Sequence, residues 1–167
     1  QRRPNFRRAV GDPAGIAAAA DLIVAAKRPV LFVGNGVLLS DACDELRALA
    51  ELAAMPVATT LIGKGAFPET HPLSVGMSGI WGTRLANETT SEADLVVAIG
   101  TAFGEADCSS WVPGVTFSFP AAKLVQIDIE PQEIGKIYPA DVGIVGDAKA
   151  TLQALVTALG ERRAALR

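Results

Sequence analysis

Short apolar runs of strand length alternate with longer stretches of helical pattern along this chain. The apolar runs are rich in β-branched residues and are bounded by glycine or proline, a pattern typical of strands buried on both faces of a parallel sheet. The clearest are residues 29–33 and 94–100, and both lead directly into a glycine turn. Further strands are predicted at residues 55–60, 123–129 and 141–145.

Capping residues and apolar spacing predict helices between these strands. Asp12, followed by proline, is expected to cap a helix over residues 13–26, and Asp147 to cap a final helix whose apolar residues repeat at i, i+3, i+4 and i+7. Ser40 and Asp41 are expected to cap the helix that follows the first strand. Further helices are predicted at residues 83–92 and 132–138. With strands alternating with helices, the pattern predicts an α/β fold: a doubly wound, six-stranded parallel sheet of Rossmann-like type.

The two ends of the chain lack this periodicity. Residues 1–11 and 161–167 are interpreted as linkers, and residues 12–160 as one Rossmann-like domain. The first residue is Gln1, so we expect a domain that belongs to a longer protein. Inside the domain, residues 61–82 and 101–114 are irregular and rich in glycine, and loops of this length are more often functional than idle.

Composition supports the fold and excludes some functions. Hydrophobic residues make up 50% of the chain but aromatic residues only 5%, which fits an aliphatic core under helices better than a β-sandwich. Residues 9–160 hold 8 basic and 17 acidic residues, so the body of the domain repels phosphate backbones and nucleic-acid binding is not expected. No apolar run is long enough for a membrane span. Cys43 and Cys108 have no partner spacing, which favours a reducing, cytoplasmic location.

The sequence offers no credible catalytic centre. His71 is the only histidine and has neither a nucleophile motif nor a second metal ligand at suitable spacing. Asp128, Glu130 and Glu133 could bind Mg²⁺ or a ribose, although capping the following turn is the commoner role. Trp81 and Trp111 could stack on a flat ligand or pack against the domain edge. We therefore predict no catalytic and no metal-ligating residue.

A ligand-binding edge is nevertheless expected. In a doubly wound sheet the segments that follow the strands converge on a crevice outside the carboxyl ends. Backbone N–H groups of Asn35 and Gly36 could receive a phosphate, and Asp128 could accept a hydrogen bond from a ribose hydroxyl. A full dinucleotide fingerprint would need a third glycine where Leu39 stands, so a plain strand–helix turn is an equal alternative. The residues assigned to this edge are Gly34, Asn35, Gly36, Gly76, Gly79, Gly100, Thr101, Asp128 and Ile129.

The order and spacing of several motifs resemble the central domain of thiamine-diphosphate-dependent enzymes of the acetolactate synthase group. The resemblance covers nearly everything from Ala17 to Leu159. It rests on Pro29–Gly36, ALAELAAMPVATT (48–60), GKGAFP (63–68) with His71-Pro72-Leu73, Gly76-Met77 with Gly79, ADLVVAIG (93–100), and KLVQIDIEPQEIGK (123–136) with Gly146-Asp147.

The resemblance implies a parent enzyme of three α/β domains in which the outer two bind thiamine diphosphate and Mg²⁺. The fragment alone would then be inert, and its partners would be the flanking domains of a homodimeric or homotetrameric parent. Acetolactate formation, carboligation, decarboxylation and acetyl transfer all remain open for that parent. The competing interpretation is a free-standing nucleotide- or NAD-binding protein, since the fold alone is shared with such proteins.

In flavin-containing members of that group, the loops matching this edge surround FAD, which adds Met77 and Phe103 to the candidate cofactor-binding residues. Those members carry an Arg-Phe-Asp-Asp-Arg-like run after the glycine that matches Gly100. This chain has Ala-Phe-Gly-Glu-Ala over residues 102–106 and so lacks both arginines. Their loss removes charge-assisted contacts with a dinucleotide and counts against FAD.

Overall fold

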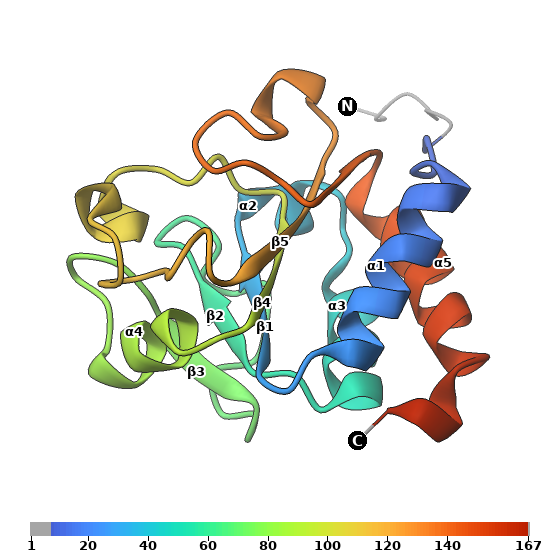
Figure 1. The fold of residues 1–167 in the computed structure, drawn as a ribbon, viewed down its shortest axis with the longest axis horizontal. Helices are drawn as coiled ribbons and strands as arrows, with labels where there is room; N and C mark the ends of the chain where they lie inside the picture. Colours follow the sequence, from blue (N-terminus) through green and yellow to red (C-terminus); the bar gives the residue numbers. More distant parts are fainter. Residues whose placement is uncertain (1–7, 167) are drawn as a thin grey trace, which may run out of the picture.

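The computed structural model describes residues 8–166. Its centre is a six-stranded sheet in which every pair of neighbours is parallel, in the order β3-β2-β1-β4-β5-β6 (Figure 1). The winding direction reverses between β1 and β4, so the predicted doubly wound fold is confirmed. The strands are β1 (Pro29–Val33), β2 (Val57–Thr59), β3 (Ser74–Met77), β4 (Leu95–Ile99), β5 (Lys123–Asp128) and β6 (Val142–Val145).

Two different layers cover the faces of this sheet (Figure 1). One face packs against α1, α3 and α5, with aliphatic side chains forming the larger core cluster. The other face is covered by α4 and by irregular chain that contains the short 3-10 helix η1, with a more aromatic cluster beneath. The helices are α1 (Pro13–Ala25), α2 (Asn35–Leu39), α3 (Cys43–Ala53), α4 (Arg84–Ser91), α5 (Ala148–Gly160), and the 3-10 turns η1 (Ala106–Trp111), η2 (Pro131–Glu133) and η3 (Arg163–Ala165).

Alternate residues of the central strands pack into the two core clusters on opposite faces of the sheet. In β1, Leu31 and Val33 belong to the aliphatic cluster, whereas Val30 and Phe32 belong to the aromatic one. All four side chains are fully buried. A strand buried on both faces needs apolar residues at every position, which is why these runs are continuous in the sequence.

Local capping explains where several helices begin. The side chain of Asp12 accepts a hydrogen bond from Gly15 N–H (2.9 Å), and that of Asp147 accepts one from Ala150 N–H (3.1 Å), so both predicted caps are confirmed. Thr83 does the same for α4, as its hydroxyl accepts from Ala86 N–H at 3.0 Å.

The prediction that Ser40 or Asp41 caps the second helix is wrong. The chain turns helical directly after β1 as α2, and Ser40 ends that helix. Asp41 has φ 54°, a left-handed conformation that cannot start a helix in the way an extended cap does. α3 then begins after Ala42, which makes no side-chain cap bond.

The structure differs from the sequence prediction in two other segments. β3 lies inside the segment 61–82 that was predicted to be irregular, as a half-buried edge strand interrupted by Gly76 at φ 90°. The helix predicted at residues 132–138 is only the single turn η2, because Ile134 is extended and Gly135 has φ 72°.

Part of the predicted linkers is attached to the domain. Ala9 C=O accepts a hydrogen bond from Asp147 N–H (2.8 Å), and Gly11 N–H donates to Thr151 Oγ1 (3.1 Å). Arg162 pairs with Asp21 of α1 at 2.9 Å. Residues 1–7 and 167 lie outside the described chain. None of the helices in residues 8–166 combines the length and hydropathy that crossing a membrane requires.

Candidate functional site

The turns that follow β1 and β4 meet at the point where the sheet reverses its winding. Gly34 N–H donates to Ile99 C=O and Gly36 N–H donates to Gly100 C=O, both at 3.0 Å. A Cβ on Gly34 would lie 2.2 Å from Gly100 O, and one on Gly36 would lie 2.6 Å from Gly100 Cα. Glycine is thus required here because two backbones pass through the same space.

A small pocket opens beside this contact, and we call it the switch-point crevice. Its volume is about 130 Å³. It brings together four of the predicted site residues from the ends of three strands, Gly36, Gly100, Asp128 and Ile129. The remaining lining residues are Leu39, Ser40, Ile127, Gly146, Asp147 and Ala148.

Asp128 is the predicted ribose-binding carboxylate. Its Oδ1 accepts a hydrogen bond from Glu130 N–H at 2.9 Å. Asp128 therefore caps the following turn, which is the commoner of the two roles considered from the sequence. Burial raises the pKa of Asp128, and the negative charges of Glu133 and Glu130 act in the same direction, against the lowering effect of the hydrogen bond. A further anionic group next to Asp128 would therefore meet repulsion.

A polar cluster that sequence reasoning missed forms one wall of the crevice. Arg8 Nη1 donates to Asp147 Oδ2 (2.9 Å) and to Ser40 Oγ (2.9 Å), and Ser40 Oγ donates to Asp147 Oδ2 (2.7 Å). Burial acts to raise the pKa of Asp147, but the bonds from Ala150 N–H, Ser40 and Arg8 outweigh it and hold that pKa below its usual value. Arg8 and Asp147 are 139 residues apart, so no local signal could have paired them.

The predicted residues Gly76, Met77 and Gly79 lie at the end of β3 and do not line the crevice. Gly79 exchanges hydrogen bonds with the Asn87 side chain, donating to Oδ1 at 2.8 Å and accepting from Nδ2 at 3.0 Å. A Cβ on Gly79 would lie 2.1 Å from Ala106 O, so this glycine too is explained by a close backbone neighbour.

Phe103 is a core residue. Its side chain is 1% exposed and packs against Phe32 and Tyr138 at ring-centroid distances of 5.5 and 5.2 Å. Thr101 is also buried, and its hydroxyl accepts a hydrogen bond from Phe103 N–H at 3.3 Å. In this conformation the Phe103 side chain cannot contact a ligand at the edge. Asn35, the remaining candidate, is the first residue of α2 and is half-buried.

The other candidate groups have structural roles. His71 Nε2 lies 3.2 Å from Glu51 Oε1, and its ring packs edge-on against Phe67. Trp111 Nε1–H donates to Phe103 C=O at 2.8 Å, which ties η1 to the loop after β4. Within residues 8–166 no three His, Cys, Asp or Glu side chains are grouped to hold a metal ion.

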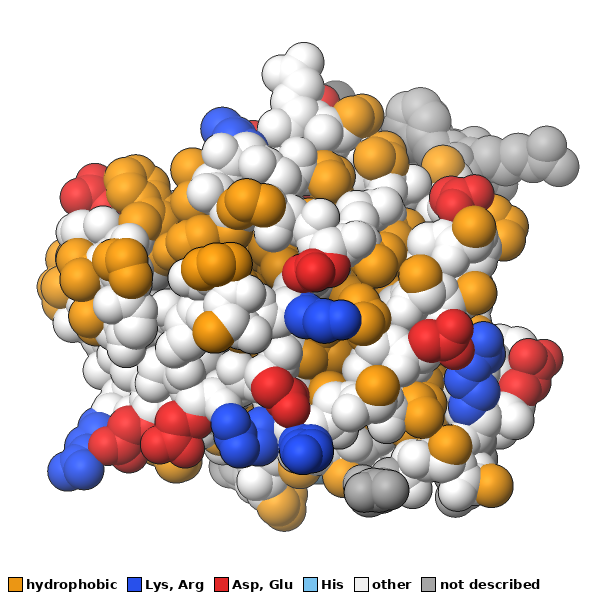
Figure 2. Space-filling view, in the orientation of Figure 1, with side chains coloured by type: hydrophobic (Ala, Val, Ile, Leu, Met, Phe, Trp, Pro, Cys, Tyr) orange, Lys and Arg blue, Asp and Glu red, His pale blue; other side chains and the backbone are white. Residues whose placement is uncertain are grey.

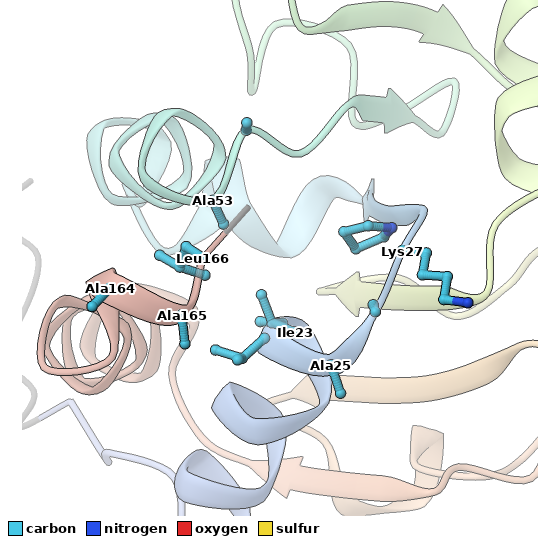
Figure 3. A pocket seen from close by; sticks show the side chains of 11 residues that line it. Ile23, Ala25, Lys27, Ala53, Ala164, Ala165 and Leu166 are labelled. Atoms are coloured by element: carbon cyan, nitrogen blue, oxygen red, sulfur yellow. The ribbon is translucent and has the colours of Figure 1, made fainter.

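A larger pocket lies away from this edge, at the carboxyl ends of α1 and α3, and has a volume of about 800 Å³. Figure 3 shows Ala164, Ala165 and Leu166 of the C-terminal segment beside Ile23 and Ala53. Its lining is almost entirely alanine and other aliphatic side chains, with Lys27 as its one charged residue. Size alone therefore does not make it a reactive site, because Lys27 is the one charged group among its lining residues.

Comparison with known proteins identifies the family. The family model described as "Thiamine pyrophosphate enzyme, central domain" matches residues 16–155. A protein of Methanocaldococcus jannaschii described as a probable acetolactate synthase large subunit is 48% identical over 158 residues, covering 93% of this chain and 26% of that protein. The acetolactate synthase large subunit of Mycobacterium tuberculosis is 47% identical over 142 residues, covering 84% of this chain and 22% of the relative.

A solved structure agrees with these relatives. A candidate thiamin diphosphate-dependent enzyme from Mycobacterium smegmatis superimposes with a TM-score of 0.72 at 28% sequence identity, covering 95% of this chain and 30% of that one. The chain thus spans about a quarter of the length of the curated relatives described above. The matched family region includes the whole of the sheet and the crevice beside it. The chain therefore belongs to the thiamine pyrophosphate enzymes, of which it is a central domain.

Proposed function

We propose that this chain is the non-catalytic central domain of a longer, acetolactate synthase-like enzyme that acts on 2-oxo acids with thiamine diphosphate. The observation that carries the proposal is the combination of length and chemistry. The relatives are about four times as long as the matched segment, and within residues 8–166 no three His, Cys, Asp or Glu side chains are grouped to hold a metal ion. Carboligation, decarboxylation and acetyl transfer are the reactions we consider for the parent.

Thiamine diphosphate and Mg²⁺ belong to the flanking domains in this proposal. When bound there, thiamine diphosphate would supply the carbanion chemistry that 2-oxo acid reactions need. The role of this chain's own residues is to support those domains. The comparisons do not favour the alternative of a free-standing nucleotide- or NAD-binding protein.

The surface that would meet the flanking domains lies on the side of η1 and the loop between β3 and α4, where hydrophobic side chains gather (Figure 2). Leu61 N–H donates to Asp107 Oδ1 (2.9 Å) and Ile80 N–H donates to Ala106 C=O (2.8 Å), so three segments are held together here. Trp81 is 68% exposed, and an exposed apolar side chain among others of its kind marks an interaction surface. The exposed apolar residues of these segments are Leu61, Ile62, Ile80, Trp81, Leu85, Trp111, Val112 and Val115.

We propose that these residues pack against neighbouring domains of a homodimeric or homotetrameric parent. An apolar surface of this kind is costly in water and is favoured where another domain covers it. The cytoplasmic location expected from the unpaired cysteines stays a prediction.

The experiment is to read the open reading frame and assay its product. We expect flanking domains of roughly 150–200 residues on each side, as is usual for α/β domains. The purified longer protein is expected to release CO₂ from pyruvate only when thiamine diphosphate and Mg²⁺ are present. A short reading frame, or turnover that is independent of thiamine diphosphate, would contradict the proposal.

A further inference from the structure

The glycines at the carboxyl edge of the sheet have a different structural role from the glycines of a dinucleotide-binding fold. In such folds a glycine lets the diphosphate approach the backbone closely. Here the space beside Gly36 and Gly100 is filled reciprocally, since a Cβ on either one would lie 2.6 Å from the Cα of the other. The glycine pattern thus permits two turns of the same chain to touch.

Three of the N–H groups at this edge that a diphosphate could use already donate hydrogen bonds within the chain. Gly36 N–H donates to Gly100 C=O (3.0 Å), Gly100 N–H donates to Ile127 C=O (2.8 Å), and Gly79 N–H donates to Asn87 Oδ1 (2.8 Å). A phosphate could gain these donors only if the hydrogen bonds between the turns broke first. Each broken bond would leave a carbonyl or amide oxygen without its partner, which is unfavourable where that oxygen is buried.

The charge and the volume of the crevice also disfavour a bound dinucleotide. The crevice is lined by the carboxylates of Asp128 and Asp147, and none of its lining residues is lysine or arginine. The nearby Arg8 does not compensate, because its Nη1 is hydrogen-bonded to Ser40 and to both oxygens of Asp147. The volume of about 130 Å³ is well below the roughly 300–1,000 Å³ of typical small-molecule pockets.

We propose that this domain holds no FAD, because the turns after β1 and β4 lock onto each other and close the crevice in which a dinucleotide would lie. The residues present do not fit the group that the family resemblance suggested for this edge. The proposal rests on the proposed function only for the choice of FAD as the ligand to test. The lock itself makes the two halves of the sheet one rigid support for the flanking domains.

The test is a calorimetric titration of the 167-residue chain with FAD and, separately, with ADP, while circular dichroism verifies that the chain is folded. We expect no saturable heat with either ligand. The longer protein is expected to release no flavin on denaturation. Saturable FAD binding by the chain, or stoichiometric flavin in the longer protein, would overturn the inference.

An Ala102→Arg variant distinguishes two possible causes for the absence of FAD binding, namely the contact between the two turns and the missing positive charge. Ala102 is exposed and follows Gly100 and Thr101, so Ala102→Arg restores a guanidinium to the loop without disturbing the core. We expect this variant also to bind no FAD. Binding by Ala102→Arg alone would mean that only the charge was missing and would overturn the lock as the cause. Loss of thiamine diphosphate dependence in the longer protein would refute the proposed function without changing either flavin result.

Discussion

Replacing Gly34 by alanine is the sharpest test of the contact between the two turns. The added methyl would lie 2.2 Å from Gly100 O and 2.8 Å from Thr101 Cα, whereas real Cβ contacts essentially never fall below 3.0 Å. Both neighbours are backbone atoms and cannot rotate away, so β1 and β4 must shift relative to each other. Gly34 has φ −102° and ψ −173°, a conformation open to alanine, so any loss of stability comes from the clash and not from backbone strain.

The expected loss follows from what overpacking costs. Forcing extra methyl groups into a packed site costs typically about 1–3 kcal/mol, and the rigid neighbours place Gly34→Ala near about 3 kcal/mol. For a domain of this size each kcal/mol lowers the melting temperature by roughly 2–4 °C, so a drop of roughly 6–12 °C is expected. Urea unfolding followed by circular dichroism measures the free energy, and a thermal scan measures the temperature.

A matched control is Gly160→Ala. Gly160 is the last residue of α5, and a Cβ there would meet nothing within 4 Å. Alanine is favoured over glycine in helices by up to about 1 kcal/mol, so this variant is expected to be neutral or slightly more stable. If Gly34→Ala were within about 0.5 kcal/mol of the wild type, the two turns would not be locked, and the inference about FAD would lose its basis.

Three further predictions concern the other residues of the edge. Asp147→Asn is expected to lower the free energy of unfolding by about 1–2 kcal/mol at neutral pH, because it weakens the helix cap and the ion pair with Arg8. The pKa of Asp147 is held below its usual value in the folded state, so this stabilisation is present above the unfolded-state pKa and is lost as pH falls through the folded-state pKa. Acid titration of both proteins should therefore show the difference in stability vanish, and a difference that persists in acid would contradict the assignment. Phe103→Ala is expected to cost about 3–5 kcal/mol in urea unfolding because its ring is buried among aromatic side chains, and a cost below about 1 kcal/mol would remove Phe103 from the core. Burial and the charge of Asp107 raise the pKa of Cys108 to about 12, so a thiol reagent should label Cys43 first and Cys108 only on unfolding; equal rates in the native protein would show that the aromatic cluster opens readily.

Much of the fold was visible in the sequence because its causes are local. β1 and β4 are buried on both faces, so every position is apolar and the strands stand out as continuous runs. The caps Asp12 and Asp147 each bond a backbone N–H three residues later, a distance that sequence inspection covers. β3 was missed because it is a half-buried edge strand with a glycine inside it, and such a strand has neither a continuous nor an alternating apolar pattern.

The candidate site was harder to predict for a physical reason. A glycine in a sequence shows that something approaches the backbone, but not whether that neighbour is a ligand or another part of the chain. Gly36 and Gly100 lie 64 positions apart, and only the folded sheet shows that each is the other's neighbour. A Gly36→Val variant would therefore disturb the fold itself, because its Cβ would lie 2.6 Å from Gly100 Cα.

The central claim is that this chain is a supporting domain whose parent, and not the chain itself, carries the chemistry. The most direct measurement compares pyruvate consumption by the 167-residue chain and by the longer protein, each with thiamine diphosphate and Mg²⁺ at equal molar concentration. We expect turnover by the longer protein and none above background by the chain. Turnover by the chain alone would contradict this claim.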